Sequence, residues 1–234
     1  MNEFRHKAVM CAFVCILSSV CGAKESKDTP GNKVTIGLLG DSTVAKQYGW
    51  GPAFASRFNE KVTVLNYAQN GKRLNSPPML ANLTKLIGKK PDYVLIQFGH
   101  NDMKRYGTDV YAEHLKDYVT KIAGGGGKPI ILSSVTRRMF GDDGKIASRV
   151  IHNRTLRDYA KAAKAVAKEK GVPFIDLNTI SINHHNKIGP KERATYNFKL
   201  QDTTHFSKKG AQAISGLIIE ELKKAAPDLT AYLK

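Results

Sequence analysis

The amino-acid sequence predicts an α/β fold in which a parallel sheet is covered by helices on both faces. Five short, β-rich apolar runs recur along the chain, longer segments with helical periodicity separate them, and glycines or prolines punctuate the boundaries. This alternation is typical of right-handed βαβ units and a parallel sheet. The chain has 234 residues, 41% hydrophobic and 24% charged, which suits one globular domain with a single sizeable core.

The predicted strands are nearly continuous in apolar character, as expected when a strand is covered on both faces. In chain order they are residues 34–39, 62–67, 93–98, 129–134 and 172–177.

The predicted helices lie between and after these strands. Residues 109–123 carry apolar side chains at helical spacing and end at a run of four glycines. Residues 150–170 repeat the pattern and stop at Gly171, and Ser207 is a suitable N-cap for a last amphipathic helix.

The first 23 residues have the layout of a secretory signal peptide. A basic start precedes an apolar segment of residues 8–20, and small residues follow around Ala23. We therefore expect a leader over residues 1–23, a linker over 24–32 and the folded domain over 33–234, in a protein that is secreted or periplasmic. The alternatives are a buried N-terminal helix and, as a minor option, a lipoprotein anchored at Cys21, which Val20 disfavours.

Loss of the leader removes every cysteine, because Cys11, Cys15 and Cys21 all lie within it. The mature chain then has no disulfide, no thiolate metal site and no cysteine nucleophile. His184 and His185 are adjacent, so they should face different sides of a helix and make a poor metal pair. No metal site is predicted.

The formal net charge of +17 falls only to +16 after cleavage, since the leader holds two basic residues and one acid. Such an excess favours polyanionic neighbours. For an exported protein an acidic polysaccharide is a better partner than nucleic acid, and the mature chain is not expected to insert stably into a membrane. Many lysines should simply be solvated on helix faces.

Ligands of parallel α/β sheets bind outside the carboxyl ends of the strands, so the residues that follow each strand are the functional candidates. Ser42 follows the first strand and could serve as a nucleophile. His205 could take its proton, and Asp202, three residues earlier, could fix the histidine tautomer.

A tetrahedral intermediate also needs hydrogen-bond donors aimed at its oxyanion. The backbone N–H groups of Ser42 and Gly71 and the side-chain amide of Asn101 all come from the same sheet edge. Asp41 and Asp102 lie nearby, and we expect both to organise their own turns.

These segments resemble the four sequence blocks of the SGNH (GDSL) hydrolases. The blocks are "GDST" at Gly40, Gly71, "GHND" at Gly99 and "DTTH" at Asp202, and their order and spacing look most like the rhamnogalacturonan acetylesterase branch. The resemblance extends over residues 34–222. It implies a three-layer, flavodoxin-like α/β/α sandwich with a five-stranded parallel sheet, and no metal or organic cofactor.

The resemblance also implies the roles of the candidate residues. Ser42 would be the nucleophile, His205 the base and Asp202 the acid, with oxyanion donors at Ser42, Gly71 and Asn101.

Cationic residues are the candidates for substrate binding. Arg137 and Arg138 follow the fourth strand, and Lys72 and Arg73 follow the second, so four cations could rim one cleft. His100 could also touch substrate, although a packed histidine bonded to backbone is an equal alternative.

The sequence thus favours an exported, monomeric acetylesterase that acts on an acetylated polysaccharide, with acidic rhamnogalacturonan preferred. One alternative is a lipase or thioesterase of the same fold that takes a longer acyl chain. Another is a non-catalytic basic protein that binds polyanions.

Overall fold

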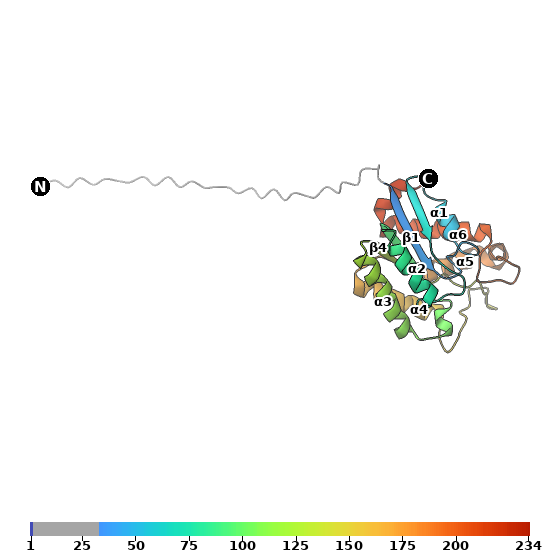
Figure 1. Ribbon diagram of the computed structural model, residues 1–234. Coiled ribbons are helices and arrows are strands. Elements are labelled where there is room, and N and C mark those ends of the chain that lie inside the picture. The colour runs from blue at the N-terminus through green and yellow to red at the C-terminus, as the bar shows by residue number, and fades with distance from the viewer. Residues whose placement is uncertain (2–32) are drawn as a thin grey trace.

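The computed structural model describes Met1 and residues 33–234 (Figure 1). Apart from Met1, the predicted leader and linker lie outside the described residues.

Five parallel strands form one sheet in the order β2-β1-β3-β4-β5. The strands are β1 (Val34–Gly40), β2 (Val62–Asn66), β3 (Tyr93–Gln97), β4 (Lys128–Leu132) and β5 (Phe174–Ile175). Each pairs in parallel with its neighbour, for example Leu38 with Leu95 across β1 and β3. This is the flavodoxin-like strand order. The predicted fold class is confirmed.

Helices cover both faces of the sheet (Figure 1). They are α1 (Gly51–Ala55), α2 (Pro77–Ile87), α3 (Thr108–Gly124), α4 (Leu156–Lys170), α5 (Leu177–Ala194) and α6 (Lys208–Ala225), with short 3-10 turns η1 (Asp102–Lys104) and η2 (Pro227–Tyr232). On one face α1, α6 and η2 pack around Trp50, and on the other α2, α3 and α4 pack around Tyr118. Two buried apolar cores therefore sandwich the sheet.

Local chemistry fixes where the helices begin. In α4 the hydroxyl and backbone N–H of Thr155 both donate to the Asp158 carboxylate at 2.8 Å, so the helix begins after Thr155. The prediction placed this start at residue 150. Ser207 caps α6 as predicted, accepting from the Gly210 backbone at 3.1 Å.

Two features differ from the predictions. Strand β2 is only half-buried, because it lies at the sheet edge, so the expectation that every strand is covered on both faces is wrong there. Helices α1, α2 and α5 were not predicted. Helix α5 is interrupted at Gly189, where φ is 75°, and its mixed polar composition gives no clear apolar stripe.

The strand order reverses between β1 and β3, which makes their carboxyl ends the switch point where such sheets bind ligands. Ser42 follows β1 and Asn101 follows β3. The topology therefore brings these two candidates to one crevice.

Candidate active site

The turn that presents Ser42 is compact because Gly40 has no side chain. A Cβ at Gly40 would lie 2.4 Å from the Val44 side chain and 2.8 Å from the Gln97 carbonyl, so no larger residue fits. The backbone N–H groups of Val44 and Ala45 both donate to the Asp41 carbonyl at 3.1 Å. Ser42 thus stands on a tight turn at the mouth of β1.

Asp41 organises this turn from inside, as expected. Its buried carboxylate accepts the backbone N–H and the hydroxyl of Thr43, both at 2.8 Å. The Thr43 hydroxyl accepts from the Gln97 amide at 2.5 Å, and Gln97 in turn accepts the Trp50 indole N–H at 2.9 Å. Trp50 is fully buried, so it belongs to the core.

Burial governs the ionisation of Asp41. The loss of solvent raises the pKa of this carboxyl to about 6, with the two Thr43 bonds acting in the opposite direction. One carboxylate oxygen, Oδ2, is buried without a hydrogen-bond partner among the described residues.

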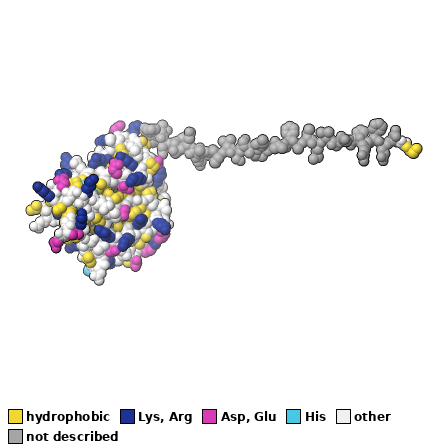
Figure 2. Space-filling model, turned by 180° about the vertical axis from the view of Figure 1, so that it is seen from behind, with side chains coloured by type: hydrophobic (Ala, Val, Ile, Leu, Met, Phe, Trp, Pro, Cys, Tyr) yellow, Lys and Arg dark blue, Asp and Glu magenta, His cyan; other side chains and the backbone are white. Residues whose placement is uncertain are grey.

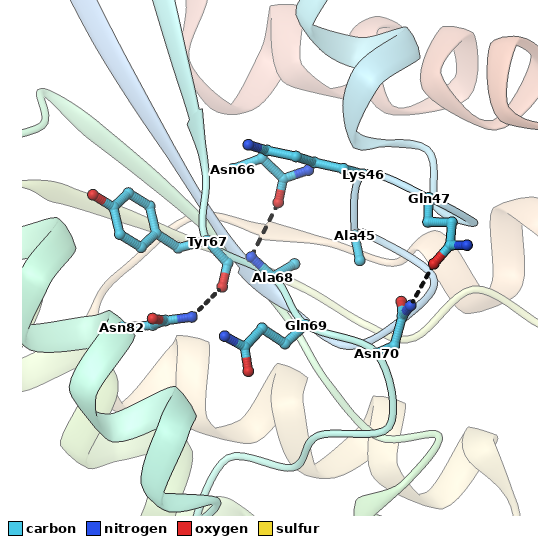
Figure 3. Close-up of a pocket in the computed structure, with 9 residues that line it drawn as sticks. All are labelled: Ala45, Lys46, Gln47, Asn66, Tyr67, Ala68, Gln69, Asn70 and Asn82. Atoms are coloured by element: carbon cyan, nitrogen blue, oxygen red, sulfur yellow. Dashed lines mark hydrogen bonds between the residues drawn. The ribbon is translucent and has the colours of Figure 1, made fainter.

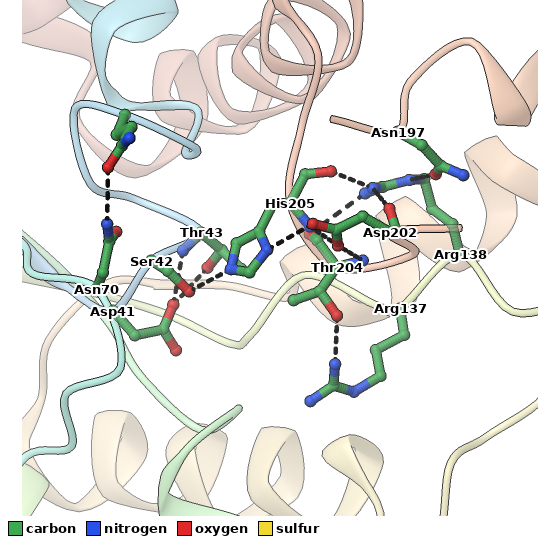
Figure 4. A network of polar contacts seen from close by, with 11 residues as sticks. Asp41, Ser42, Thr43, Asn70, Arg137, Arg138, Asn197, Asp202, Thr204 and His205 are labelled. Carbon is green, nitrogen blue, oxygen red and sulfur yellow. Dashed lines mark hydrogen bonds and ion pairs between the residues drawn. The ribbon is translucent and has the colours of Figure 1, made fainter. Parts of the chain in front are cut away.

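Ser42, His205 and Asp202 form a continuous hydrogen-bonded relay (Figure 4). The Ser42 Oγ lies 2.8 Å from His205 Nε2, and His205 Nδ1 lies 2.8 Å from Asp202 Oδ2. With Nδ1 protonated toward the carboxylate, Nε2 is the acceptor for the serine proton. The arrangement has the geometry of an activated nucleophile.

A tight local turn sets Asp202 against His205. The Asp202 Oδ1 accepts the backbone N–H of Thr204 at 3.0 Å and of His205 at 2.9 Å, which leaves Oδ2 for the imidazole. Burial by itself raises the pKa of Asp202. The backbone and ring donors of His205 and the Thr204 N–H outweigh burial and hold the pKa below its ordinary value. Asp202 is therefore ionised at neutral pH.

The predicted oxyanion donors lie on the loops after β1, β2 and β3. Gly71 has a φ of +72°, a left-handed conformation that a side chain would strain. Within residues 33–234 the backbone N–H groups of Ser42 and Gly71 donate to no protein acceptor. Both donors remain free for a ligand.

Asn101 is oriented by two partners that the sequence did not reveal. Its Nδ2 donates to the Lys72 carbonyl at 3.1 Å, and its Oδ1 accepts from the Lys104 ammonium at 3.1 Å. One amide proton is thus used and the other remains for a substrate oxygen. Asp102 is buried and accepts from the Leu74 backbone at 3.0 Å, so it holds the loop after β2 as well as its own.

Arg138 does not bind substrate, and that prediction is wrong. Its side chain is 0% exposed. The guanidinium donates to the carbonyls of Asp202 at 3.1 Å and His205 at 2.5 Å, and to Asn197 Oδ1 at 2.9 Å (Figure 4). It also lies 4.6 Å from the centre of the Phe206 ring. Arg138 therefore holds in place the loop of residues 202–205, which we call the acid–base loop.

His100 is also too deeply buried to touch substrate. It is 2% exposed, and its Nε2 lies 2.9 Å from the Val135 carbonyl. Burial, reinforced by the positive charge of Arg137, keeps the pKa of His100 well below its ordinary value. The packed-histidine alternative is the one that the structure supports.

The remaining cations do not gather into a continuous rim. Arg137 is 7% exposed and donates to the Thr204 hydroxyl, while Arg73 is half-buried beside Asn75. On the face drawn in Figure 2, lysine and arginine side chains are scattered among acidic ones. Substrate contact by Arg137 and Arg73 stays a prediction.

Two properties of the described residues concern metal binding and membrane insertion. Residues 33–234 contain no group of three or more histidine, cysteine or acidic side chains placed to hold a metal ion. His185 is buried beside Tyr196. No helix in the described part of the chain is long and apolar enough to cross a bilayer.

Comparison with known proteins identifies related sequences over most of the chain. Residues 38–213 match the GDSL-like Lipase/Acylhydrolase family. Rhamnogalacturonan acetylesterase RhgT from Bacillus subtilis is 34% identical over 225 residues, covering 86% of this chain and 94% of that protein. A probable rhamnogalacturonan acetylesterase, YesY, from the same organism is 28% identical and covers 84% and 92%.

Solved structures share the fold. The crystal structure of YxiM from Bacillus subtilis superposes with a TM-score of 0.69 at 27% identity, over 84% of this chain and 58% of that one. The acetylxylan esterase Axe2 from Geobacillus stearothermophilus gives a TM-score of 0.63 at 18% identity, over 82% and 95%. At that identity the second likeness concerns the fold alone.

Proposed function

The chain belongs to the GDSL-like lipase/acylhydrolase family of carboxylic ester hydrolases, and from that premise we propose that it removes acetyl groups from a polysaccharide. The observation that carries the proposal is the bonded relay of Ser42, His205 and Asp202 at the switch point of the sheet. Rhamnogalacturonan is the preferred polymer, because two relatives carry that substrate in their names.

In the first half-reaction Ser42 Oγ attacks the acetyl carbonyl while its proton passes to His205 Nε2. The carbonyl oxygen becomes an oxyanion that accepts hydrogen bonds from the Ser42 and Gly71 backbone and from the Asn101 amide. The tetrahedral intermediate collapses, and His205 gives its proton to the departing sugar hydroxyl. An acetyl group remains on Ser42.

In the second half-reaction His205 removes a proton from water, which attacks the acetyl-serine. The second tetrahedral intermediate uses the same donors and breaks down to acetate and free Ser42, with the proton returning through His205. The ionised Asp202 holds the imidazole in one tautomer and stabilises the imidazolium that forms twice per turnover.

A longer acyl chain is the second candidate, because a partly apolar hollow lies beside the acid–base loop. It has a volume of about 550 Å³, and Pro52, Phe198 and Phe206 are among its lining residues. Phe206 directly follows His205. An acyl tail held at Ser42 would extend past His205 into this hollow.

The experiment that separates these candidates measures acetate release from acetylated pectin, xylan and chitin fragments beside aryl esters of rising chain length. We expect acetate from at least one glycan and a decline in kcat/KM for aryl esters longer than acetate. A rise with chain length would favour the second candidate, and no ester cleavage at all would end the proposal.

We further propose that the protein is exported and acts as a monomer. Export is supported by the leader-like N-terminal sequence and by a polymeric substrate that does not enter cells. N-terminal sequencing of the protein from the medium or periplasm should begin near residue 24, and light scattering should give a mass near that of one chain.

A further inference from the structure

A polar hollow of about 430 Å³ lies beside the candidate active site, at the carboxyl end of β2 (Figure 3). Residues 45–47, which follow the nucleophile turn, form one wall, and residues 66–70 form another. Asn82 of α2 lines it as well.

The walls of this hollow continue directly into the catalytic loops. Ala45 comes three residues after Ser42, and Asn70 directly precedes Gly71. The Asn70 amide donates to Gln47 Oε1 at 3.3 Å, which bridges the two walls. In Figure 4 Asn70 lies on the far side of Ser42 from Arg138. A ligand in the hollow would therefore adjoin a group bound at Ser42.

Side-chain amides dominate the lining. Of the nine lining residues five carry a carboxamide, namely Gln47, Asn66, Gln69, Asn70 and Asn82. A carboxamide offers both N–H donors and a carbonyl acceptor. Sugar hydroxyls donate and accept as well, so this lining matches a hydroxyl-rich ligand better than an apolar one.

Most of these amides keep hydrogen-bonding capacity. Asn66 is committed to the protein, since it donates to the Val44 carbonyl at 2.9 Å and accepts the Ala68 N–H at 3.0 Å. Asn82 uses one donor on the Tyr67 carbonyl at 2.8 Å. The half-buried Gln69 side chain forms no hydrogen bond with the described residues and projects into the space drawn in Figure 3.

The charge of the lining residues further restricts the chemical class of the ligand. Lys46 is the one charged side chain among the nine lining residues, and it is exposed. An exposed lysine is screened by salt and contributes little to binding. The amides should recognise hydroxyl groups rather than a carboxylate.

We propose that this hollow is a subsite for a neutral sugar unit, which neighbours the acetylated unit in the same glycan chain. The proposal rests on the proposed function, because it assumes a polymeric acetylated substrate. It gives the polymer a second point of attachment that positions the acetyl ester at Ser42.

The test compares Gln69→Ala with the wild type on two substrates, an acetylated oligosaccharide of at least four units and an aryl acetate. We expect KM for the oligosaccharide to rise about tenfold, the loss from one or two hydrogen bonds to a bound ligand. The loss in kcat/KM for the aryl acetate should be at least fivefold smaller. The oligosaccharide effect should be equal at low and high salt.

Two further variants keep the test decisive. Gln69→Glu retains the shape but replaces the N–H donors with acceptors, so it should impair the oligosaccharide reaction even if Gln69→Ala folds poorly. Asn183→Ala removes an exposed amide on α5, away from both hollows, and should change the reaction of neither substrate. Thermal melting reports whether each variant is folded.

The outcomes separate the two proposals. Equal losses on both substrates, no loss on either, or an effect that disappears at high salt would overturn the subsite. A wild-type enzyme that cleaves aryl acetate but no acetylated glycan would overturn the proposed function itself.

Discussion

The two loops that carry the proposed triad are held in place by different means. The nucleophile turn is held largely from within, because the Asp41 carboxylate binds Thr43 two residues away. The acid–base loop has its own local turn at Asp202, but its carbonyls point backward onto Arg138, which comes from the segment after β4. The first loop combines this internal contact with bonds from Gln97 and Asn66, whereas the second depends on a side chain more than sixty residues distant.

The two aspartates show what this difference does to charge. Asp41 is buried with few donors, and its pKa is raised to about 6, whereas Asp202 accepts three hydrogen bonds and its pKa is lowered. The first serves as a structural acceptor, and its burial opposes ionisation more strongly than its two Thr43 donors favour it. The second must be ionised to hold His205. Each environment suits the role that the geometry gives the residue.

Asn101 belongs to neither loop, so its substitution tests whether stabilisation of the oxyanion is separate from proton transfer. Asn101→Ala should lower kcat by about a hundredfold to a thousandfold with a smaller change in KM, because an oxyanion bond strengthens in the transition state. Steady-state kinetics on an aryl acetate measures this. A change in KM alone would make Asn101 a substrate-binding residue.

Arg138 tests the dependence of the acid–base loop on its distant support. Arg138→Met leaves the carbonyls of Asp202 and His205 without their donor, at roughly 1–3 kcal/mol for each buried acceptor. We expect unfolding to become easier by about 3 kcal/mol and kcat to fall about a hundredfold in protein that is still folded, because small displacements of His205 are costly.

The readout for this positioning role is the rate at which an organophosphonate labels Ser42, measured well below the melting temperature. A purely structural role would leave that rate unchanged in the folded fraction. Arg138→Lys keeps the charge but loses the forked donors, so it should recover stability more than labelling rate.

The pH dependence of folding stability tests the contrast between the two loops through Asp41. Because its folded pKa is raised, the folded protein holds this proton more tightly than the unfolded chain does. The stability it contributes is present in full below about pH 4 and is lost as pH rises through about 6.

Asp41→Asn cannot titrate, so the free energy of unfolding of this variant should gain about 3 kcal/mol relative to the wild type between pH 4 and pH 7. Urea titrations at the two pH values measure the difference. An equal difference in unfolding free energy between the variant and the wild type at both pH values would show that Asp41 ionises as easily in the folded protein as in the unfolded chain.

The smallest effect concerns the two half-buried cations after β2. Replacing Lys72 and Arg73 together with glutamine should raise KM for an acidic acetylated fragment by less than about threefold, since screened charges contribute little. The effect should vanish in 0.5 M salt, where charges are screened over a length of about 4 Å. A large rise in KM confined to the acidic substrate would instead support a substrate cleft that is rimmed by cations.

The turn around Ser42 was predictable because its contacts are local. Gly40, Asp41 and Thr43 sit within four residues, and the apolar run before them indicates a buried strand. The five strands were predictable from their local apolar runs, and their parallel pairing from the alternation of strands and helices along the chain. Strand β2 was misjudged because an edge position depends on the whole sheet.

The support of the acid–base loop was not predictable in the same way. Nothing near Arg138 indicates that its guanidinium turns inward to carbonyls contributed by residues 202–205, so adjacent arginines after a strand suggested a substrate contact. His100 was misjudged similarly, because its burial is set by packing against the Val135 backbone. Lys104 lies three residues from Asn101, and that i,i+3 spacing is the one signal that could have found it.

The central claim is that Ser42 is the nucleophile, and its labelling by an organophosphonate ester tests this most directly. Intact mass spectrometry followed by peptide mapping should find one adduct per chain, on Ser42, formed in proportion to the loss of aryl acetate hydrolysis. Ser42→Ala should take no label and lose several orders of magnitude in kcat, while Ser56→Ala, at an exposed serine, should behave as wild type. Full activity in Ser42→Ala, or inactivation with the adduct on another residue, would contradict the claim.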